Sequence, residues 1–411
     1  MGDFGIEDFQ FSDAAVRLVA ESDIEAIAKL FRLNYGHDYP FPQVFDGTWV
    51  KRAIYSENVV CVVLEEEGEV VATGAVLLDY GDYNDQLGEL TRLAVHPHHV
   101  GHGAGRRIIS ALFEVVQDNV EFAFGEARTA HSFSQHMLDR AGFTAIGFFP
   151  HQYLQPGRAE SSILYGQLYG HAEVVRSDDL PQVIPEIAGL AHHVLGSMGL
   201  PLELTVFEES EPYPIDSLCT LTPMDRDSAE DLERYEGHRI HQLIHEGIQP
   251  EKAMLFGPVS IDQGLPFMKR HGATFLMAVD ESQQPIGAVG FLQDQTNGIV
   301  KGIELLGWEE AVRGCLCVAL IDAATERNAR IIEVNISAYD PRLQQTFLDL
   351  GFFPAAYGPA MVYDEWERLD VVKMLKLNVP YEPGEMKLTE KAQEVVSIVE
   401  QGFRSAQFSL S

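Results

Sequence analysis

The stretch LTRLAVHPHHVGHGAGRRIISAL, residues 90–112, joins a strand pattern to a helix pattern through a loop rich in glycine and histidine. The strand pattern ends at Val95, and apolar residues at helical spacing begin at Ile108. Glycines at 101, 103 and 105 allow the backbone to curl, so that the first helical N–H groups, which have no partner in the helix, face one point. Such a cup binds anions, and the helix dipole adds to the attraction. The stretch therefore predicts a ligand that carries phosphate groups.

The histidines of this loop raise the alternative of a metal site. They are His96, His98, His99 and His102. A metal ion needs several imidazoles that converge on one point with support from neighbouring groups. Side chains so close together on a strand-to-helix turn mostly point apart, so we expect no metal. Arg106 and Arg107 supply positive charge at the rim of the loop.

The order of the glycines narrows the choice of phosphate ligand. The dinucleotide fingerprint G-x-G-x-x-G fails because Arg106 stands where its last glycine belongs. A Walker loop ends in Gly-Lys-Ser or Gly-Lys-Thr, whereas Gly105 precedes two arginines. Nicotinamide cofactors and ATP are therefore poor candidates, and the pyrophosphate of coenzyme A remains.

Composition sets wider limits. The chain has 411 residues, 46% of them hydrophobic, which is too long for one ordinary domain. Its formal net charge of −33 disfavours nucleic acid and anionic membranes and leans toward a cationic acceptor such as a polyamine, a lysine side chain or a basic peptide. Four cysteines lack redox or zinc spacing, and no stretch has the length of a membrane span or a leader. We expect core thiols in a soluble, cytoplasmic protein.

The order of predicted elements indicates one fold repeated twice. Residues 14–170 read as strand, helix, three strands, helix, strand, helix and two strands, which implies a parallel crossover inside a mixed sheet. A similar order returns later, and MLDRAGF at 137–143 is matched by FLDLGF at 347–352. We therefore expect an α/β protein of the α+β, mixed-sheet kind. Its expected parts are a first domain (1–170), a proline-bearing connector (171–230) with a helical stretch at 177–200, a second domain (231–380) and a C-terminal helix (381–411). The returning order begins with a helix at 226–244.

The stretch at 90–112 resembles motif A of the GNAT superfamily of N-acetyltransferases, in which a strand leads through R/Q-x-x-G-x-G/A into a helix. The resemblance implies two tandem GNAT-like domains, each a mixed, mostly antiparallel sheet flanked by helices. It also implies an acyl-CoA co-substrate, most simply acetyl-CoA, and an amine-bearing small molecule or peptide as acceptor. The implied coenzyme contacts are Leu93, Ala94, Val95, Val100, Gly101, His102, Gly103, Ala104, Gly105, Arg106 and His131.

The resemblance and the strand pattern both assign the general base to Glu89. It lies six residues before Val95 and, under strict alternation, on the same face of the strand. The general acid is harder to assign, because Leu138 stands where many relatives have a tyrosine. We assign it to Tyr153, with His131, Tyr165 and water as alternatives. Val100 is a second departure, since it replaces the usual arginine or glutamine of the motif.

The second copy has no glycine loop after its corresponding strand. Trp308, Glu309 and Glu310 follow that strand, and two acidic groups would repel a pyrophosphate. We expect a degenerate half that shapes the substrate cleft or a homodimer surface. The alternative to an N-acyltransferase is a non-catalytic acyl-CoA sensor or scaffold. The acceptor and the acyl chain length stay open.

Overall fold

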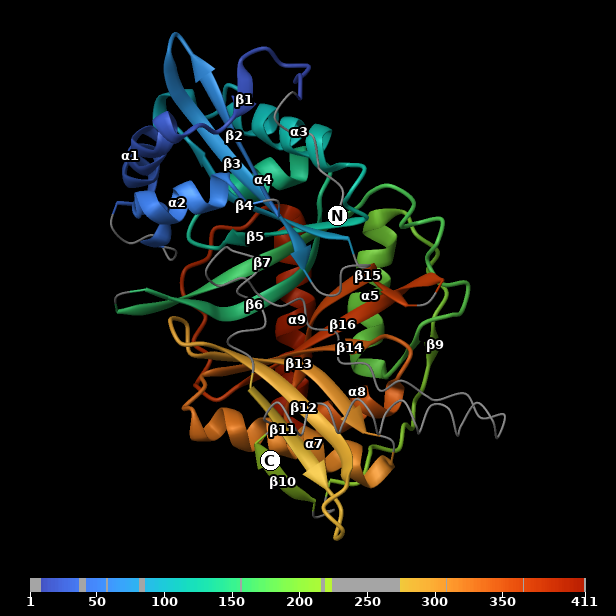
Figure 1. Cartoon of the computed structure of the whole chain (residues 1–411). Coiled ribbons are helices and arrows are strands. Elements are labelled where there is room, and N and C mark those ends of the chain that lie inside the picture. Colours follow the sequence, from blue (N-terminus) through green and yellow to red (C-terminus); the bar gives the residue numbers. More distant parts are fainter. Residues whose placement is uncertain are drawn as a thin grey trace.

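The computed structural model describes nine stretches of the chain, and every structural statement below refers to them (Figure 1). They are residues 9–36, 42–56, 58–80, 86–155, 157–215, 219–223, 274–307, 309–364 and 366–409. The predicted helix at 226–244 and the first part of the predicted second domain, 231–273, lie outside these residues.

Fourteen strands form one continuous sheet, with helices packed against it. The strands of the first half are β1 (Val16–Leu18), β2 (Val59–Glu66), β3 (Glu69–Tyr80), β4 (Leu87–Val95), β5 (Phe122–Arg128), β6 (Thr144–Gln155) and β7 (Arg158–Leu168). Those of the second half are β10 (Thr220–Pro223), β11 (Thr274–Val279), β12 (Pro285–Asp294), β13 (Ile299–Gly307), β14 (Ile331–Ser337), β15 (Phe353–Asp364) and β16 (Glu367–Leu377). A separate parallel pair is formed by β8 (Gln182–Val183) and β9 (Thr205–Val206).

The sheet repeats the same strand order in both halves. The first half runs β1-β2-β3-β4-β5-β7-β6, and the second, counted from its outer edge, runs β10-β11-β12-β13-β14-β16-β15. Within the large sheet only β4 with β5 and β13 with β14 are parallel. The pairing of β5 with β7 matches that of β14 with β16 when 209 is added to each residue number. Under that shift Gly147 corresponds to Ala356, and these two residues pair with each other where the halves meet. A local two-fold relation therefore passes through the junction.

Helices cover the sheet and the junction. They are α1 (Ile24–Tyr35), α2 (Gly47–Ile54), α3 (Ala104–Val116), α4 (Phe133–Arg140), α5 (Pro185–Met198), α7 (Glu310–Glu326), α8 (Pro341–Asp349) and α9 (Glu390–Ser409), with short 3₁₀ turns at Glu21–Asp23, Pro42–Phe45 and Pro97–His99. Ile108 and Leu112 of α3 are fully buried against β2, β3 and β4. Figure 1 shows α9 beside the junction, where it packs on β6 and β15. The last helix thus packs on both halves of the sheet.

The predicted fold class is confirmed: the sheet is mixed, mostly antiparallel and flanked by helices. The sequence patterns missed α2, β10 and β16, and they extended the connector helix, which begins only at Pro185. The boundaries predicted for the domains stay a prediction, because both halves share one sheet.

The prediction of four core thiols is wrong for two of them. Cys219 and Cys315, 96 residues apart in the chain, form a disulfide, whereas Cys61 and Cys317 are free. Such a pairing carries no signal in cysteine spacing. Disulfides are rare in reducing compartments, so the predicted cytoplasmic location loses part of its support and stays a prediction.

None of the described helices combines the length and the apolar character needed to span a bilayer.

Candidate active site

A bulge in β4 opens the sheet of the first half. Ala75 pairs with Thr91 but Thr73 pairs with Ala94, so β4 has one extra residue at this point. Arg92, inside the bulge, has a φ of 52°. β4 then pairs with β5 only over Leu87–Glu89, and the two strands separate beyond it. The prediction that Glu89 and Val95 share a face is wrong, because the bulge breaks the alternation.

The glycine loop presents unpartnered backbone amides. Gly101 and Gly103 have φ values of 86° and 88°, which favour glycine. The N–H groups of Ala104, Gly105 and Arg106 donate to no acceptor within the described part of the chain, and no side chain caps α3. These donors and the positive end of the helix dipole lie at one point, which is the arrangement that binds phosphate. The predicted anion cup is therefore open.

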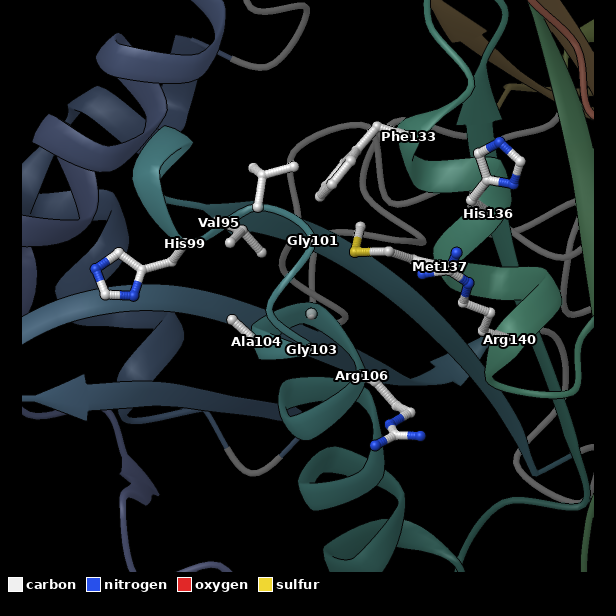
Figure 2. A pocket seen from close by; sticks show the side chains of 12 residues that line it. Val95, His99, Gly101, Gly103, Ala104, Arg106, Phe133, His136, Met137 and Arg140 are labelled. Carbon is white, nitrogen blue, oxygen red and sulfur yellow. The ribbon is translucent and has the colours of Figure 1, made fainter.

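A cavity of about 220 Å³ lies at this helix end, between α3 and α4 (Figure 2). It is lined by Val95, His99, Val100, Gly101, Gly103, Ala104, Gly105, Arg106, Phe133, His136, Met137 and Arg140. A Cβ atom at Gly105 would lie 2.1 Å from the sulfur of Met137, so a larger residue there would force the Met137 side chain to move. Arg106 and Arg140 bring positive charge to the cavity wall. Arg140 gave no signal in the sequence.

The other cation predicted at the rim is held elsewhere. Arg107 pairs with Asp13 through Nε, at 2.6 Å, and with Glu66 through Nη1, at 2.5 Å. The Arg107 hydrogen bond lowers the pKa of Asp13 below its ordinary value. The charge of Arg107 is therefore already compensated, and Arg106 alone remains of the predicted pair.

The rings of His98 and His99 lie near that of His96, with ring centres 5.3 and 5.7 Å away, but Nδ1 of His96 and Nδ1 of His99 each have another partner. His96 Nδ1 accepts a hydrogen bond from the backbone N–H of His98, at 3.3 Å. His99 Nδ1 lies 3.1 Å from Glu66 Oε2. Over the described ranges, no three histidine, cysteine or acidic side chains are grouped to hold a metal ion.

A second cavity, of about 90 Å³, lies where β4 and β5 separate. Its lining residues are Tyr35, Glu89, Leu90, Thr91, Arg92, Leu93, Glu126, Arg128, His131, Ser134, Leu138 and Tyr153. Both cavities are lined by neighbouring residues of β4 and of α4, such as Met137 in the first and Leu138 in the second. The anion cup and the second cavity therefore follow the same strand and the same helix.

A carboxylate that the sequence analysis missed lies in the second cavity. Glu126 Oε2 accepts hydrogen bonds from the Tyr153 hydroxyl, at 2.6 Å, and from the Ser162 hydroxyl, at 2.8 Å. Next to it, the buried Glu160 pairs with Arg128 through two hydrogen bonds of 2.9 and 2.5 Å. The sequence feature that could have pointed to Glu126 is the pair of charged residues, Glu126 and Arg128, inside the otherwise apolar run 122–128.

Two rings in this cavity have shifted pKa values. Burial, reinforced by the positive charge of Arg128, lowers the pKa of His131 below its ordinary value, so its ring is neutral near pH 7. Burial raises the pKa of Tyr35, whose ring lies 6.4 Å from the His131 ring. The cavity thus contains two carboxylates, a neutral imidazole and tyrosine hydroxyls.

The predicted site residues fall into three groups. Loop residues 100, 101 and 103–106, together with Val95, line the first cavity. Glu89, Leu93, His131 and Tyr153 line the second. The side chains of Ala94 and His102 line neither cavity, and Tyr165, an alternative acid, is also absent from both. Ala94 instead packs with apolar residues of α1 and β2.

Comparison with known proteins agrees with this geometry. Residues 24–143 match the model of the Acetyltransferase (GNAT) family. The matched segment runs from α1 through the glycine loop to the end of α4 and includes both β4 and β5. The chain therefore contains a GNAT acetyltransferase domain. No curated protein sequence matches the chain.

Solved structures resemble only part of the chain. The ribosomal-protein-alanine N-acetyltransferase from Brucella melitensis is 17% identical, covers 37% of this chain and 98% of its own, and has a TM-score of 0.34. An N-acetyltransferase from Staphylococcus aureus Mu50 is 13% identical, covers 38% of this chain and 99% of its own, and has a TM-score of 0.34. The ribosomal-protein-S18-alanine N-acetyltransferase from Escherichia coli is 16% identical, covers 40% of this chain and 97% of its own, and has a TM-score of 0.32.

Proposed function

We propose that the protein is an acyl-CoA-dependent N-acyltransferase, most simply an N-acetyltransferase, that acts on a primary amine. The open cup of backbone amides at the start of α3, whose cavity follows β4 toward a second, carboxylate-containing cavity, carries the proposal. The cup takes the pyrophosphate, with Arg106 and Arg140 beside it. The pantetheine arm lies along β4 where its backbone no longer pairs with β5. The thioester then lies beside Glu89 and Tyr153.

The proposed reaction is a direct transfer. The amine nitrogen attacks the thioester carbonyl carbon, a C–N bond forms, and the C–S bond breaks to release coenzyme A thiolate. Glu89 accepts the proton that the amine loses, and Tyr153 donates a proton to the thiolate. Each proton transfer of this kind typically accelerates the reaction by a factor of roughly 10²–10⁴.

The Glu126 carboxylate positions the acid in this proposal. By accepting the Tyr153 O–H at 2.6 Å, it holds the hydroxyl in the cavity until the thiolate forms. Tyr153→Phe is expected to lower kcat while leaving acetyl-CoA affinity unchanged. Leu138, in the wall of the same cavity, contributes no proton.

The second half of the sheet is degenerate in this proposal. The connector packs against α7 just after the first turn of the helix, since a Cβ at Gly314 would lie 1.9 Å from the Pro214 carbonyl oxygen. Glu310 in that turn pairs with Arg342 of α8 at 2.5 Å. Arg342 corresponds to Phe133, which lines the coenzyme cavity in the first half. In the second half, an ion pair thus lies at the end of the helix where the first half has the open cup.

Transfer is tested by incubating the protein with acetyl-CoA and a panel of amines, amino acids, amino sugars and peptides. Thiol release that depends on the amine, together with an acetylated product in mass spectra, supports the proposal. Acetyl-CoA binding without transfer to any amine favours the sensor alternative, to which the apolar Leu138 and Val100 already point. If acetyl-CoA does not bind at high micromolar concentration, both the acyltransferase proposal and the sensor alternative are wrong.

A further inference from the structure

Arg92 occupies an unusual place in the second cavity. Its φ of 52° lies in the left-handed region, which a residue with a side chain adopts only at a conformational cost. Backbone strain of this kind is concentrated at functional sites. The bulge turns Arg92 toward α2, where the guanidinium carbon lies 4.7 Å from the centre of the Trp49 ring. Stacking on an aromatic ring fixes the plane of the guanidinium and leaves its edge for hydrogen bonds.

Two of the three nitrogen atoms of the Arg92 guanidinium have no acceptor among the described residues. Its Nε and Nη1 atoms are buried, and neither forms a hydrogen bond within the described part of the chain. Other arginines of the same half are paired: Arg17 with Asp23, and Arg128 with Glu160. Buried donors without an acceptor are rare in folded proteins, and a buried cation normally has an anionic partner. The described residues supply no acceptor for these two donors, and a bound ligand can supply one.

The position of Arg92 connects it to the reacting groups. It lines the cavity that contains Glu89, Glu126 and Tyr153. It also lines a smaller apolar pocket, of about 30 Å³, that is walled by Phe31, Trp49 and other residues of α1, α2 and β2. Glu89 and Arg92 are only three positions apart in the chain, and both residues line the same cavity. A small molecule can contact both.

We propose that the acceptor amine carries a carboxylate and that this carboxylate binds the guanidinium of Arg92. The inference rests on the proposed function and names the substrate class of the same site: an amino acid or a similar amino-carboxylate, not a polyamine. A carboxylate matches the planar fork of a guanidinium with two parallel hydrogen bonds, which an ammonium group cannot do. The acidic surface of the chain favoured polyamines, but the local charge at Arg92 selects against a second cation.

The test compares acceptors that differ only in the carboxylate. Suitable pairs are lysine with cadaverine, ornithine with putrescine, and phenylalanine with phenethylamine. With acetyl-CoA as donor, kcat/KM is expected to be about tenfold or more higher for one or more carboxylated members than for their partners, which corresponds to the loss of one ion-paired contact.

Variants assign the preference to Arg92. Arg92→Gln is expected to bring the ratio within each pair close to one, mainly by raising KM for the carboxylated member. Arg92→Lys keeps the charge without the fork and is expected to give an intermediate ratio. Arg52→Gln, an exposed change on α2, is the matched control and should leave every ratio unchanged. Acetyl-CoA titration and thermal melting of each variant verify that the fold and the coenzyme site persist.

The outcomes separate the two proposals. A preference for carboxylated amines that Arg92→Gln removes supports the inference. Equal turnover within every pair, a preference for the decarboxylated amines, or a preference that survives Arg92→Gln overturns it while leaving the acyltransferase proposal intact. If acetyl-CoA binds but no amine of any kind is acetylated, the acyltransferase proposal fails, and the inference that depends on it fails too.

Discussion

Eight residues separate β4 from α3 in the first half of the sheet, whereas two separate β13 from α7 in the second. The longer connection contains the glycines that expose the helix amides. The shorter one leaves no room for such a loop. Arg313 of α7 also donates a hydrogen bond from Nε to the carbonyl oxygen of Gly307, the last residue of β13, at 2.8 Å. Under the proposed function, strand order alone therefore does not make a coenzyme site, and the connection after the fourth strand determines whether the sheet has one.

The proposed chemical groups differ in the same way. By strand register, Glu89 corresponds to Lys301, Glu126 to Asn335, and Tyr153 to Val362. Lys301 lies 3.9 Å from the buried Glu333, which also pairs with Lys373. Burial would raise the pKa of Glu333, but the two lysines hold it below its ordinary value. The second half thus has a closed ion cluster where the first has a cavity.

The largest expected effect comes from the proposed base of the first half. Glu89→Gln removes the group that accepts the amine proton, so kcat should fall by roughly 10²–10⁴. Acetyl-CoA affinity should stay within about twofold, because Glu89 lies away from the anion cup. Steady-state kinetics and calorimetry measure the two quantities. Glu25→Gln, on the exposed face of α1, is the control, and normal turnover by Glu89→Gln at neutral pH would show that another group is the base.

The ion cluster of the second half should affect stability rather than catalysis. Lys373→Met leaves the buried Glu333 with Lys301 alone and should lower the free energy of unfolding by about 3 kcal/mol. At a temperature where the variant is folded, acetyl-CoA affinity should not change. Urea denaturation measures the stability, with the exposed Lys391→Met as control. A loss of acetyl-CoA affinity in folded Lys373→Met would contradict the division of roles between the halves.

A carboxylate placed in the anion cup should weaken coenzyme binding. Gly103→Glu strains a left-handed position and repels the pyrophosphate, so the Kd for acetyl-CoA should rise about 30-fold. Gly68→Glu makes the same change at a φ of 82° in the β2–β3 turn and serves as the matched control, since a Cβ meets nothing within 4 Å at either position. Equal affinities of the two variants in calorimetry would place the coenzyme elsewhere.

The smallest expected effect is a pH dependence from His131. Because its pKa is lowered in the folded protein, the unfolded chain binds the proton more readily, and stability falls as the pH decreases below about 6.5. His131→Gln removes this penalty. The urea midpoint of the native protein should therefore drop more between pH 7.5 and pH 5.5 than that of the variant. An equal drop of the urea midpoint in both proteins would show that His131 is not buried in its neutral form. His102→Gln, at an exposed position, is the control.

Local patterns predicted the glycine loop and, apart from α2, the succession of helices and strands along the first half of the chain. A left-handed φ at Gly101 and Gly103 leaves a direct trace in the sequence, because few other residues adopt it. Alternating and helical apolar patterns carry the same kind of local information. The family resemblance added Glu89 and the coenzyme contacts, and the family match at 24–143 agrees with it.

Features that depend on distant contacts were not predictable in this way. The bulge at Arg92 follows from how β3 and β4 pair, and it overturned the expected alternation. Glu126 joins the site only because β6 brings Tyr153 to β5, and Arg107 is lost from it because Asp13 and Glu66 lie nearby. The sequence shows each of these residues but not its partner.

Calorimetric titration of the intact chain with acetyl-CoA tests the central claim most directly, because it counts the coenzyme sites. The account predicts one site per chain, weakened by Gly103→Glu and unaffected by Arg342→Met, which breaks the ion pair at the start of α7. Two sites per chain, or a single site that Arg342→Met weakens and Gly103→Glu does not, would contradict it.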